Sequence, residues 1–212
     1  MKMSLSLLLL FGLTSCRATP AKETAPIPYA AFLETVKADK KALREKPLAD
    51  ARKYFFGLVN KQIPAYWGGT PWDFNGTTRT PGTGQIACGY FITNTLTDFG
   101  FPIERIKLAQ AASSVLIKAV TVDITYPKDV PALKQYVLAR ADGSVYIVGL
   151  DFHTGYITRE KNEVYFIHSN YINRKGVMKE RVDESAALQA SKTFMIGDMT
   201  ANDAMLQKWL AN

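Results

Sequence analysis

The sequence has few of the residues that bind metals and form disulfides. Its 212 residues include two cysteines, Cys16 and Cys88, and two histidines, His153 and His168. If the thiol of Cys16 is covalently modified, Cys88 has no second cysteine to pair with, and an intramolecular disulfide is excluded. A metal site made of one cysteine and two histidines is an alternative use of these residues, but zinc ligands normally lie closer together in sequence.

Long apolar runs, internal repeats and low-complexity blocks are absent after the first residues, so no segment there is expected to cross a membrane as a helix. The composition, 47% hydrophobic and 21% charged, is typical of one globular domain with a real core. The formal net charge of +7 favours polyanions such as anionic lipid or cell-wall polymers, or reflects a solvated surface without a role. Nucleic acid is not an expected partner, because no basic run is interleaved with aromatic residues.

The N-terminus has the pattern of an export signal: Lys2, then an apolar run over 5–13, then small residues up to Cys16. The ending Leu-Thr-Ser-Cys resembles a bacterial lipoprotein signal, in which the cysteine is lipidated and becomes the first residue. Ordinary secretory cleavage nearby is the alternative. The lipoprotein interpretation predicts a protein anchored by lipid in the bacterial cell envelope, outside the cytoplasm. The expected division is a signal peptide (1–16), a polar tether (17–27) and one domain with an N-terminal helical extension (28–212).

Helical spacing of apolar residues dominates the first half of the domain, and short β-rich runs dominate the second. The predicted helices cover 29–46, 47–63 (ending before Pro64), 88–99, 103–119, 131–140 and 201–212. The predicted strands cover 120–126, 145–152, 153–160 and 163–170, with 177–182 and 192–197 as added edge strands. The segment 66–87 contains five glycines and two prolines and is expected to be a loop. Helices followed by strands of an antiparallel sheet indicate an α+β fold.

The chemistry suggested by this arrangement is that of a cysteine nucleophile. Cys88 is expected in the first turn of a helix, where the positive end of the helix dipole would lower its thiol pKa. His153 is a candidate base for the thiol proton, and His168 a candidate partner that orients the His153 ring. A hairpin turn at 160–162 would bring the two histidines onto adjacent strands. One strand register places both rings on the same face of the sheet, and a shift of one residue places them on opposite faces. A structural role for a buried Cys88 is the alternative.

The order of these residues resembles that of the NlpC-type cell-wall cysteine peptidases of the papain-like superfamily, over roughly residues 60–170. The matching segments are Tyr66-Trp67-Gly68-Gly69, Cys88, His153-Thr154-Gly155 and His168. The resemblance implies a papain-like core in which the nucleophile helix packs on an antiparallel sheet, and it implies Tyr66 as an oxyanion or substrate contact. Gln85 is a second candidate for that contact, with a solvent-facing side chain as the alternative. Where the family commonly has Asp-Cys-Ser, this chain has Ala87-Cys88-Gly89, so it lacks the aspartate that helps bind a peptide amine.

The expected function is that of a lipid-anchored hydrolase that cuts an amide bond in peptidoglycan peptides and requires no cofactor. Cys88 would attack the carbonyl carbon, with the backbone N–H of Cys88 among the donors to the oxyanion. Two alternatives stay open at this point. One is a non-catalytic envelope lipoprotein that binds cell-wall fragments or a partner protein, and the other is a thiol-dependent acyltransferase on the same fold.

Overall fold

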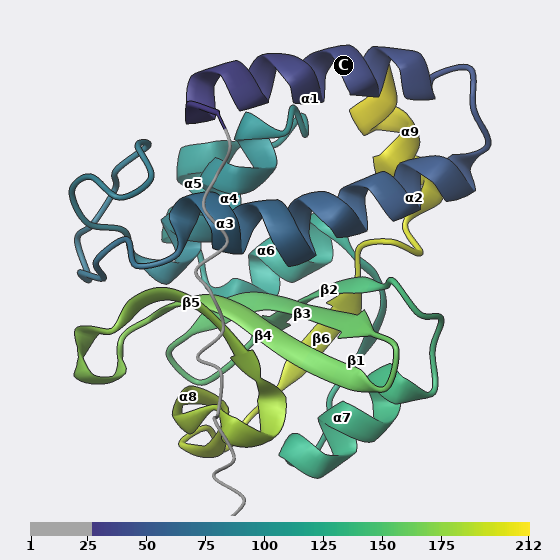
Figure 1. Cartoon of the computed structure of the whole chain (residues 1–212). Helices are drawn as coiled ribbons and strands as arrows, with labels where there is room; N and C mark the ends of the chain where they lie inside the picture. The colour runs from purple at the N-terminus through teal and green to yellow at the C-terminus, as the bar shows by residue number, and fades with distance from the viewer. Residues whose placement is uncertain (1–26) are drawn as a thin grey trace, which may run out of the picture.

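The computed structural model describes residues 27–212, so the predicted signal peptide, the lipidation at Cys16 and all but the last residue of the tether lie outside the described residues. The described residues form a six-stranded antiparallel sheet with helices on both faces (Figure 1). The predicted α+β class is therefore confirmed. Within residues 27–212, no helix combines the length and the apolar character needed to cross a bilayer.

The strand order across the sheet is β1-β6-β2-β3-β4-β5. The strands are β1 (Val122–Thr125), β2 (Val145–Gly149), β3 (Thr154–Glu160), β4 (Glu163–Asn170), β5 (Gly176–Arg181) and β6 (Met195–Asp198). β5 lies at an edge as predicted. The prediction of an edge strand over 192–197 is wrong, because β6 lies between β1 and β2 and is buried along its whole length. Gly197 permits this position, since a Cβ there would overlap the Thr121 hydroxyl on the covering helix layer.

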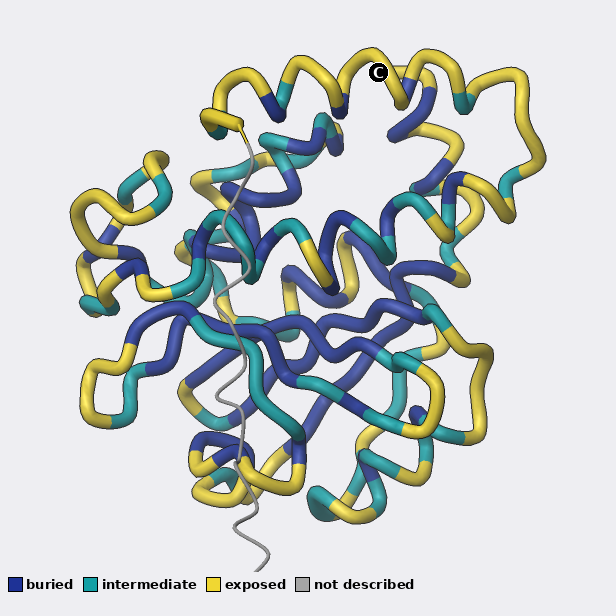
Figure 2. The backbone as a smooth tube through the Cα atoms, in the orientation of Figure 1, coloured by how far each residue is buried: buried dark blue, intermediate teal, exposed yellow. Residues whose placement is uncertain are grey.

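Both faces of the sheet are buried, which Figure 2 shows as a dark blue layer in the middle of the molecule. Alternate residues of the strands enter two separate clusters. Val145 and Ile147 of β2 pack with the larger helical layer, whereas Tyr146 and Val148 pack with the smaller one. The strands are consequently apolar on both sides, unlike strands of a sheet with one wet face.

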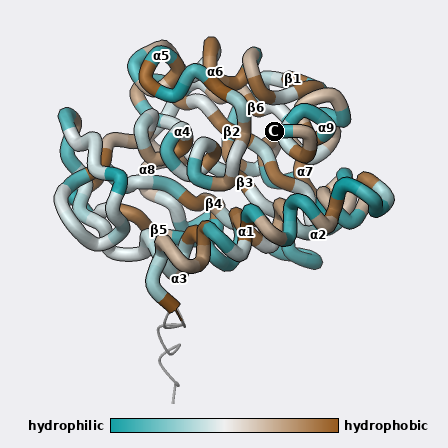
Figure 3. The backbone as a smooth tube through the Cα atoms, turned by 90° about the horizontal axis from the view of Figure 1, so that it is seen from above, coloured by the Kyte–Doolittle hydropathy of each residue, from teal (hydrophilic) through white to brown (hydrophobic). Residues whose placement is uncertain are grey.

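The larger layer contains the N-terminal helices, the helix that begins at Cys88 and the C-terminal helix. Its members are α1 (Tyr29–Leu43), α2 (Leu48–Gly57), a π-helical turn (Leu58–Gln62), α3 (Ile63–Trp67), α4 (Cys88–Asp98), α5 (Arg105–Gln110), α6 (Ser113–Val120) and α9 (Asp203–Ala211). The smaller layer contains α7 (Val130–Leu138) and α8 (Ala186–Gln189). α1 lies farther from the sheet than α2, and its outer side is mostly exposed and hydrophilic (Figures 2 and 3).

Pro64 does not end the second helix, contrary to the prediction. The helix continues through the π-helical turn and α3 to Trp67. Proline lacks the N–H that would bond the carbonyl of Asn60 in an α-helix, and the Lys179 ammonium of β5 donates to that carbonyl instead, at 3.2 Å. A partner from the sheet therefore satisfies the acceptor that the proline leaves open.

The helix predicted over 103–119 is in fact two helices, α5 and α6, separated at Ala111 and Ala112. Ala111 has an extended backbone, which turns the chain so that α6 can pack on β2. The contact is close, because a Cβ at Gly149 of β2 would overlap the Ser113 side chain of α6. Both alanines at the break line a hollow next to Cys88.

Candidate active site

Cys88 is the first residue of α4, as the sequence predicts. The preceding Ala87 is extended and caps no N–H group with its side chain, so the first N–H groups of the helix are directed at the space around the thiol. Gly89 is required by packing, since a Cβ there would overlap the backbone carbonyl of Ala109 on α5. The glycine that follows the cysteine therefore allows α5 to lie against the start of α4.

The two histidines meet at one end of the β3–β4 hairpin. The hairpin closes at Lys161–Asn162, with Glu160 paired to Glu163, and this register places both rings on the same face of the sheet. His153 Nε2 lies 2.8 Å from His168 Nδ1. Gly155 makes the approach possible, because a Cβ there would lie 2.8 Å from the Cβ of His168 and overlap the Phe166 ring. Only a glycine at the third position of the His-Thr-Gly segment therefore leaves room for the His168 and Phe166 side chains.

A carboxylate extends this pair into a series of three groups. His168 Nε2 lies 3.0 Å from Glu180 Oε1 on β5. Because a carboxylate accepts hydrogen bonds, His168 Nε2 carries the proton and His168 Nδ1 accepts the Nε2–H of His153. That assignment leaves the Nδ1 lone pair of His153 as the free base. Sequence reasoning missed Glu180, whose only signal was a carboxylate on the strand predicted to follow the His168 strand.

Both rings are enclosed, with 4% of His153 and none of His168 exposed. Tyr171 and Phe166 lie against the His153 ring, with centroids 5.0 Å and 5.9 Å away. Burial lowers the pKa of His153 well below its ordinary value, and the neighbouring His168 lowers it further. Burial also lowers the pKa of His168, although Glu180 opposes the shift. His153 is therefore a neutral imidazole at physiological pH.

Glu180 is a carboxylate in this setting. Burial alone would raise its pKa, but hydrogen bonds from His168 and Ser185 hold the pKa below the ordinary value. The series consequently ends in a fixed negative charge, which would stabilise a proton received by His153.

The thiol of Cys88 differs from the prediction. Burial raises its pKa, and the backbone N–H groups of Thr154, Gly89 and Cys88 offset that effect only in part. The expectation of a lowered thiol pKa is wrong for the resting protein, because desolvation outweighs the helix N-terminus. Within the described chain no hydrogen bond joins the sulfur directly to the His153 ring, and the thiol and the imidazole are both neutral at rest.

Cys88 and His153 form part of the walls of two hollows. The larger one, of about 610 Å³, is bounded by the loop before α4, by the start of β3 and by Tyr171. The smaller one, of about 240 Å³, is bounded by α5, the start of α6 and residues 150–154. Because both residues border both hollows, a substrate lying across the pair would place one part on each side of the sulfur.

The structure does not bring Tyr66 or Gln85 to these hollows. Tyr66, on α3, stacks on Phe32 of α1 with ring centroids 4.7 Å apart and belongs to the aromatic cluster of the N-terminal helices. Gln85 has an exposed side chain, and its carbonyl accepts the Thr78 N–H. Neither residue lines a hollow beside Cys88, so neither has the position of an oxyanion donor there.

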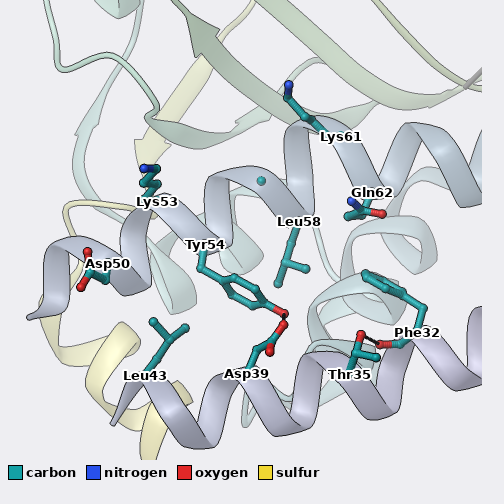
Figure 4. A pocket seen from close by; sticks show the side chains of 11 residues that line it. Phe32, Thr35, Asp39, Leu43, Asp50, Lys53, Tyr54, Leu58, Lys61 and Gln62 are labelled. Carbon is teal, nitrogen blue, oxygen red and sulfur yellow. Dashed lines mark hydrogen bonds between the residues drawn. The ribbon is translucent and has the colours of Figure 1, made fainter. Parts of the chain in front are cut away.

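A separate hollow of about 500 Å³ lies between α1 and α2 (Figure 4). The side chains of Phe32, Leu43 and Leu58 point into it, and Tyr54 donates to Asp39 across it at 2.9 Å. Its lining includes no thiol and no imidazole. The residues expected to carry the predicted nucleophile chemistry line the hollows beside Cys88 and not this one.

Comparisons with known proteins add no relative. The chain matches no protein-family model, no curated protein and no solved structure. Among residues 27–212, no three histidine, cysteine, aspartate or glutamate side chains are grouped so that they could hold a metal ion. The functional argument therefore depends on the geometry around Cys88.

Replacing Glu180 with alanine should lower kcat by about tenfold or more, because His168 would lose the acceptor that fixes its tautomer. Glu180→Gln should recover most of the rate, since its amide oxygen can still accept from His168 Nε2. The measurement is kcat for both variants on one peptide substrate, beside a thermal melt of each. Equal impairment of the two variants with unchanged melting temperatures would show that the charge of Glu180, and not its capacity to accept, sets the rate. A lowered melting temperature in both would indicate a structural role.

Acid should destabilise the fold through the buried His153. The unfolded chain takes up a proton below pH 6.5, the ordinary value, whereas folded His153 resists protonation. The free energy of unfolding should therefore fall as the pH decreases below 6.5, by up to about 1.4 kcal/mol per pH unit from this group. Urea unfolding at several pH values measures this slope, and His153→Gln should reduce it. A slope unchanged by the substitution would contradict the assignment.

Proposed function

We propose that this protein is a cysteine hydrolase that cuts an amide bond, with Cys88 as nucleophile and His153 as base. The observation that carries the proposal is that Cys88 and His153 share the walls of two hollows while His153 is bonded in series to His168 and Glu180. A buried, oriented imidazole that shares a hollow with a partly exposed thiol supports general-base activation of a nucleophile.

The reaction would proceed in two steps. In the first, the sulfur forms a bond to the carbonyl carbon while His153 Nδ1 takes the thiol proton and delivers it to the leaving amine, so the C–N bond breaks and a thioester remains. In the second, His153 takes a proton from water and the water oxygen forms a bond to the thioester carbon. The C–S bond then breaks, the carboxylic acid leaves, and the sulfur takes the proton back from His153. The Cys88 N–H, at the start of α4, would stabilise the oxyanion in both steps.

The raised thiol pKa fits a mechanism in which proton transfer accompanies attack. A thiol that is neutral at rest does not oxidise or alkylate readily, and it becomes nucleophilic when a bound substrate brings the ring and sulfur into hydrogen-bonding geometry. The absence of a direct bond between sulfur and ring among the described residues is compatible with such tightening on binding.

The natural substrate in this proposal is a peptide of the bacterial cell wall, and the protein reaches it from the lipid anchor predicted at Cys16. The test is to incubate the protein with purified cell-wall peptides and with acetylated synthetic peptides and to measure the release of new amino groups. Added hydroxylamine tests for the thioester, because a hydroxamate forms when a thioester is intercepted. Product analysis with and without an added amine separates the two reactions, because a hydrolase releases the free acid in water whereas an acyltransferase forms the new amide. The proposal fails if no peptide loses an amide bond.

A further inference from the structure

The larger hollow beside Cys88 is aromatic and uncharged. Five of its lining residues are aromatic: Trp72, Phe74, Tyr90, Phe152 and Tyr171. The other lining residues are Asn75, Thr77, Ala87, Cys88, Gly89, Ala109, Gln110 and His153. No lysine, arginine, aspartate or glutamate is among them, and His153 is neutral for the reason given above. A charged group entering this hollow would lose water without gaining an ionic partner.

Two of the aromatic rings are exposed to an extent that the fold itself does not explain. Phe74 is 79% exposed and Phe152 is 94% exposed. They come from different loops, Phe74 from the segment before α4 and Phe152 from the segment before β3, yet both border the same hollow. Apolar rings from separate loops that converge beside a nucleophile are typical of a ligand-binding surface.

Two cations lie near the aromatic rings of this wall. The Arg105 guanidinium lies 6.0 Å from the centroid of the Tyr90 ring and does not line the hollow. The Arg174 guanidinium lies 5.8 Å from the centroid of the Trp72 ring and is paired with the carboxylate of Asp73. Neither charged residue lines the hollow itself. Guanidinium groups therefore lie near two of the rings, but no charged side chain lines the hollow.

The smaller hollow beside Cys88 differs from the larger one in its volume and its lining residues. Ala109, Ala111 and Ala112 form part of its wall, and at about 240 Å³ it holds less than half the volume of its neighbour. Asp151 is its one charged lining residue, and this carboxylate accepts hydrogen bonds from the Lys192 backbone and the Thr193 hydroxyl. The space on this side of the sulfur suits a small group.

We propose that the substrate of the hydrolase carries a bulky, uncharged apolar group on one side of the scissile amide, bound in the aromatic hollow, and a small group on the other. This inference depends on the function proposed above and narrows it. Acidic and basic residues of a cell-wall peptide would have to lie outside the aromatic hollow. Selectivity would come from apolar contact and from the cost of leaving a charge unpaired.

Four acetylated peptide amides that differ at one residue test the proposal, with the sequence alanine-X-alanine-alanine and X as phenylalanine, alanine, glutamate or lysine. The phenylalanine peptide should have a kcat/KM at least about tenfold above those of the glutamate and lysine peptides. Phe74→Ala and Phe152→Ala should each reduce that ratio. The matched control is Tyr126→Ala, since Tyr126 is 67% exposed and borders neither hollow, and it should keep the ratio of the unaltered protein.

Binding to the Cys88→Ala variant, measured by calorimetry, separates this inference from the proposed function. Tighter binding of the phenylalanine peptide than of the glutamate and lysine peptides supports the inference even if the unaltered protein cuts none of them, an outcome that would remove only the hydrolase. Equal binding of all four peptides, or tighter binding of a charged one, overturns the inference whether or not cleavage occurs.

Discussion

Cys88→Ala is expected to abolish amide hydrolysis while the fold is retained. The substitution removes one sulfur atom from a partly exposed side chain at the start of α4, where the helix is held by bonds that do not involve the thiol. Loss of a covalent nucleophile of this kind typically reduces kcat by about 10⁴-fold or more. The measurement is single-substrate kinetics on the peptide that the unaltered protein cuts best, together with a thermal melt.

Cys88→Ser is the matched control for shape. It keeps a side chain that can hydrogen-bond to His153, yet its hydroxyl is much harder to ionise than a thiol, so its rate should also be far below that of the unaltered protein. Residual activity above about one per cent in the alanine variant, with the melting temperature unchanged, would show that another group makes the attack.

His153→Ala should give the second largest loss, a fall in kcat of about 10²- to 10⁴-fold, because the thiol proton would have no acceptor. Without the base, the reaction depends on the small fraction of thiolate, and the thiol pKa is raised by burial. The residual rate should therefore increase about tenfold per pH unit on the alkaline side until the thiol ionises.

The activity of the unaltered protein should be limited at low pH by protonation of His153. His153 must be neutral to act as base, and its pKa is lowered well below the ordinary 6.5, so activity should persist below the pH at which a free imidazole becomes protonated. A pH profile of kcat/KM measures the midpoint of this acid limb. A midpoint at or above 6.5 would contradict the environment described for His153, and a flat profile for His153→Ala would contradict its role.

Local sequence signals predicted the elements that carry Cys88 and His168 and the segment that ends in His153. The glycine-rich loop followed by an apolar run placed the start of α4 at Cys88, and alternation with a charged turn placed the β3–β4 hairpin. Each of these elements is determined by residues that are close together in the sequence, so each could be predicted from a single segment. Tyr66 does not lie at the site that the resemblance implied. Its ring stacks on Phe32 of another helix, and this contact between distant segments of the chain could not be read from the sequence around Tyr66.

Features that depend on distant contacts could not be predicted. Glu180 meets His168 only because of the pairing between β4 and β5, in which His168 lies opposite Met178 and Glu180 lies two residues farther along β5. The thiol pKa is raised by burial and only partly offset by backbone N–H groups, one of them from the distant Thr154, so a helix-terminus argument alone gives the wrong sign. The continuation of the helix through Pro64 likewise required a donor from Lys179 in the last third of the chain.

Consecutive residues of β5 connect the two sides of the sheet. Lys179 bonds the Asn60 carbonyl of the N-terminal helices, while Glu180, facing the other way, bonds His168. The hydrogen bond from Lys179 thus attaches the N-terminal helices to the strand that positions His168. In the proposed hydrolase, a chain shortened to begin after Trp67 would keep Cys88, both histidines and Glu180, yet β5 would lose this attachment on its other face.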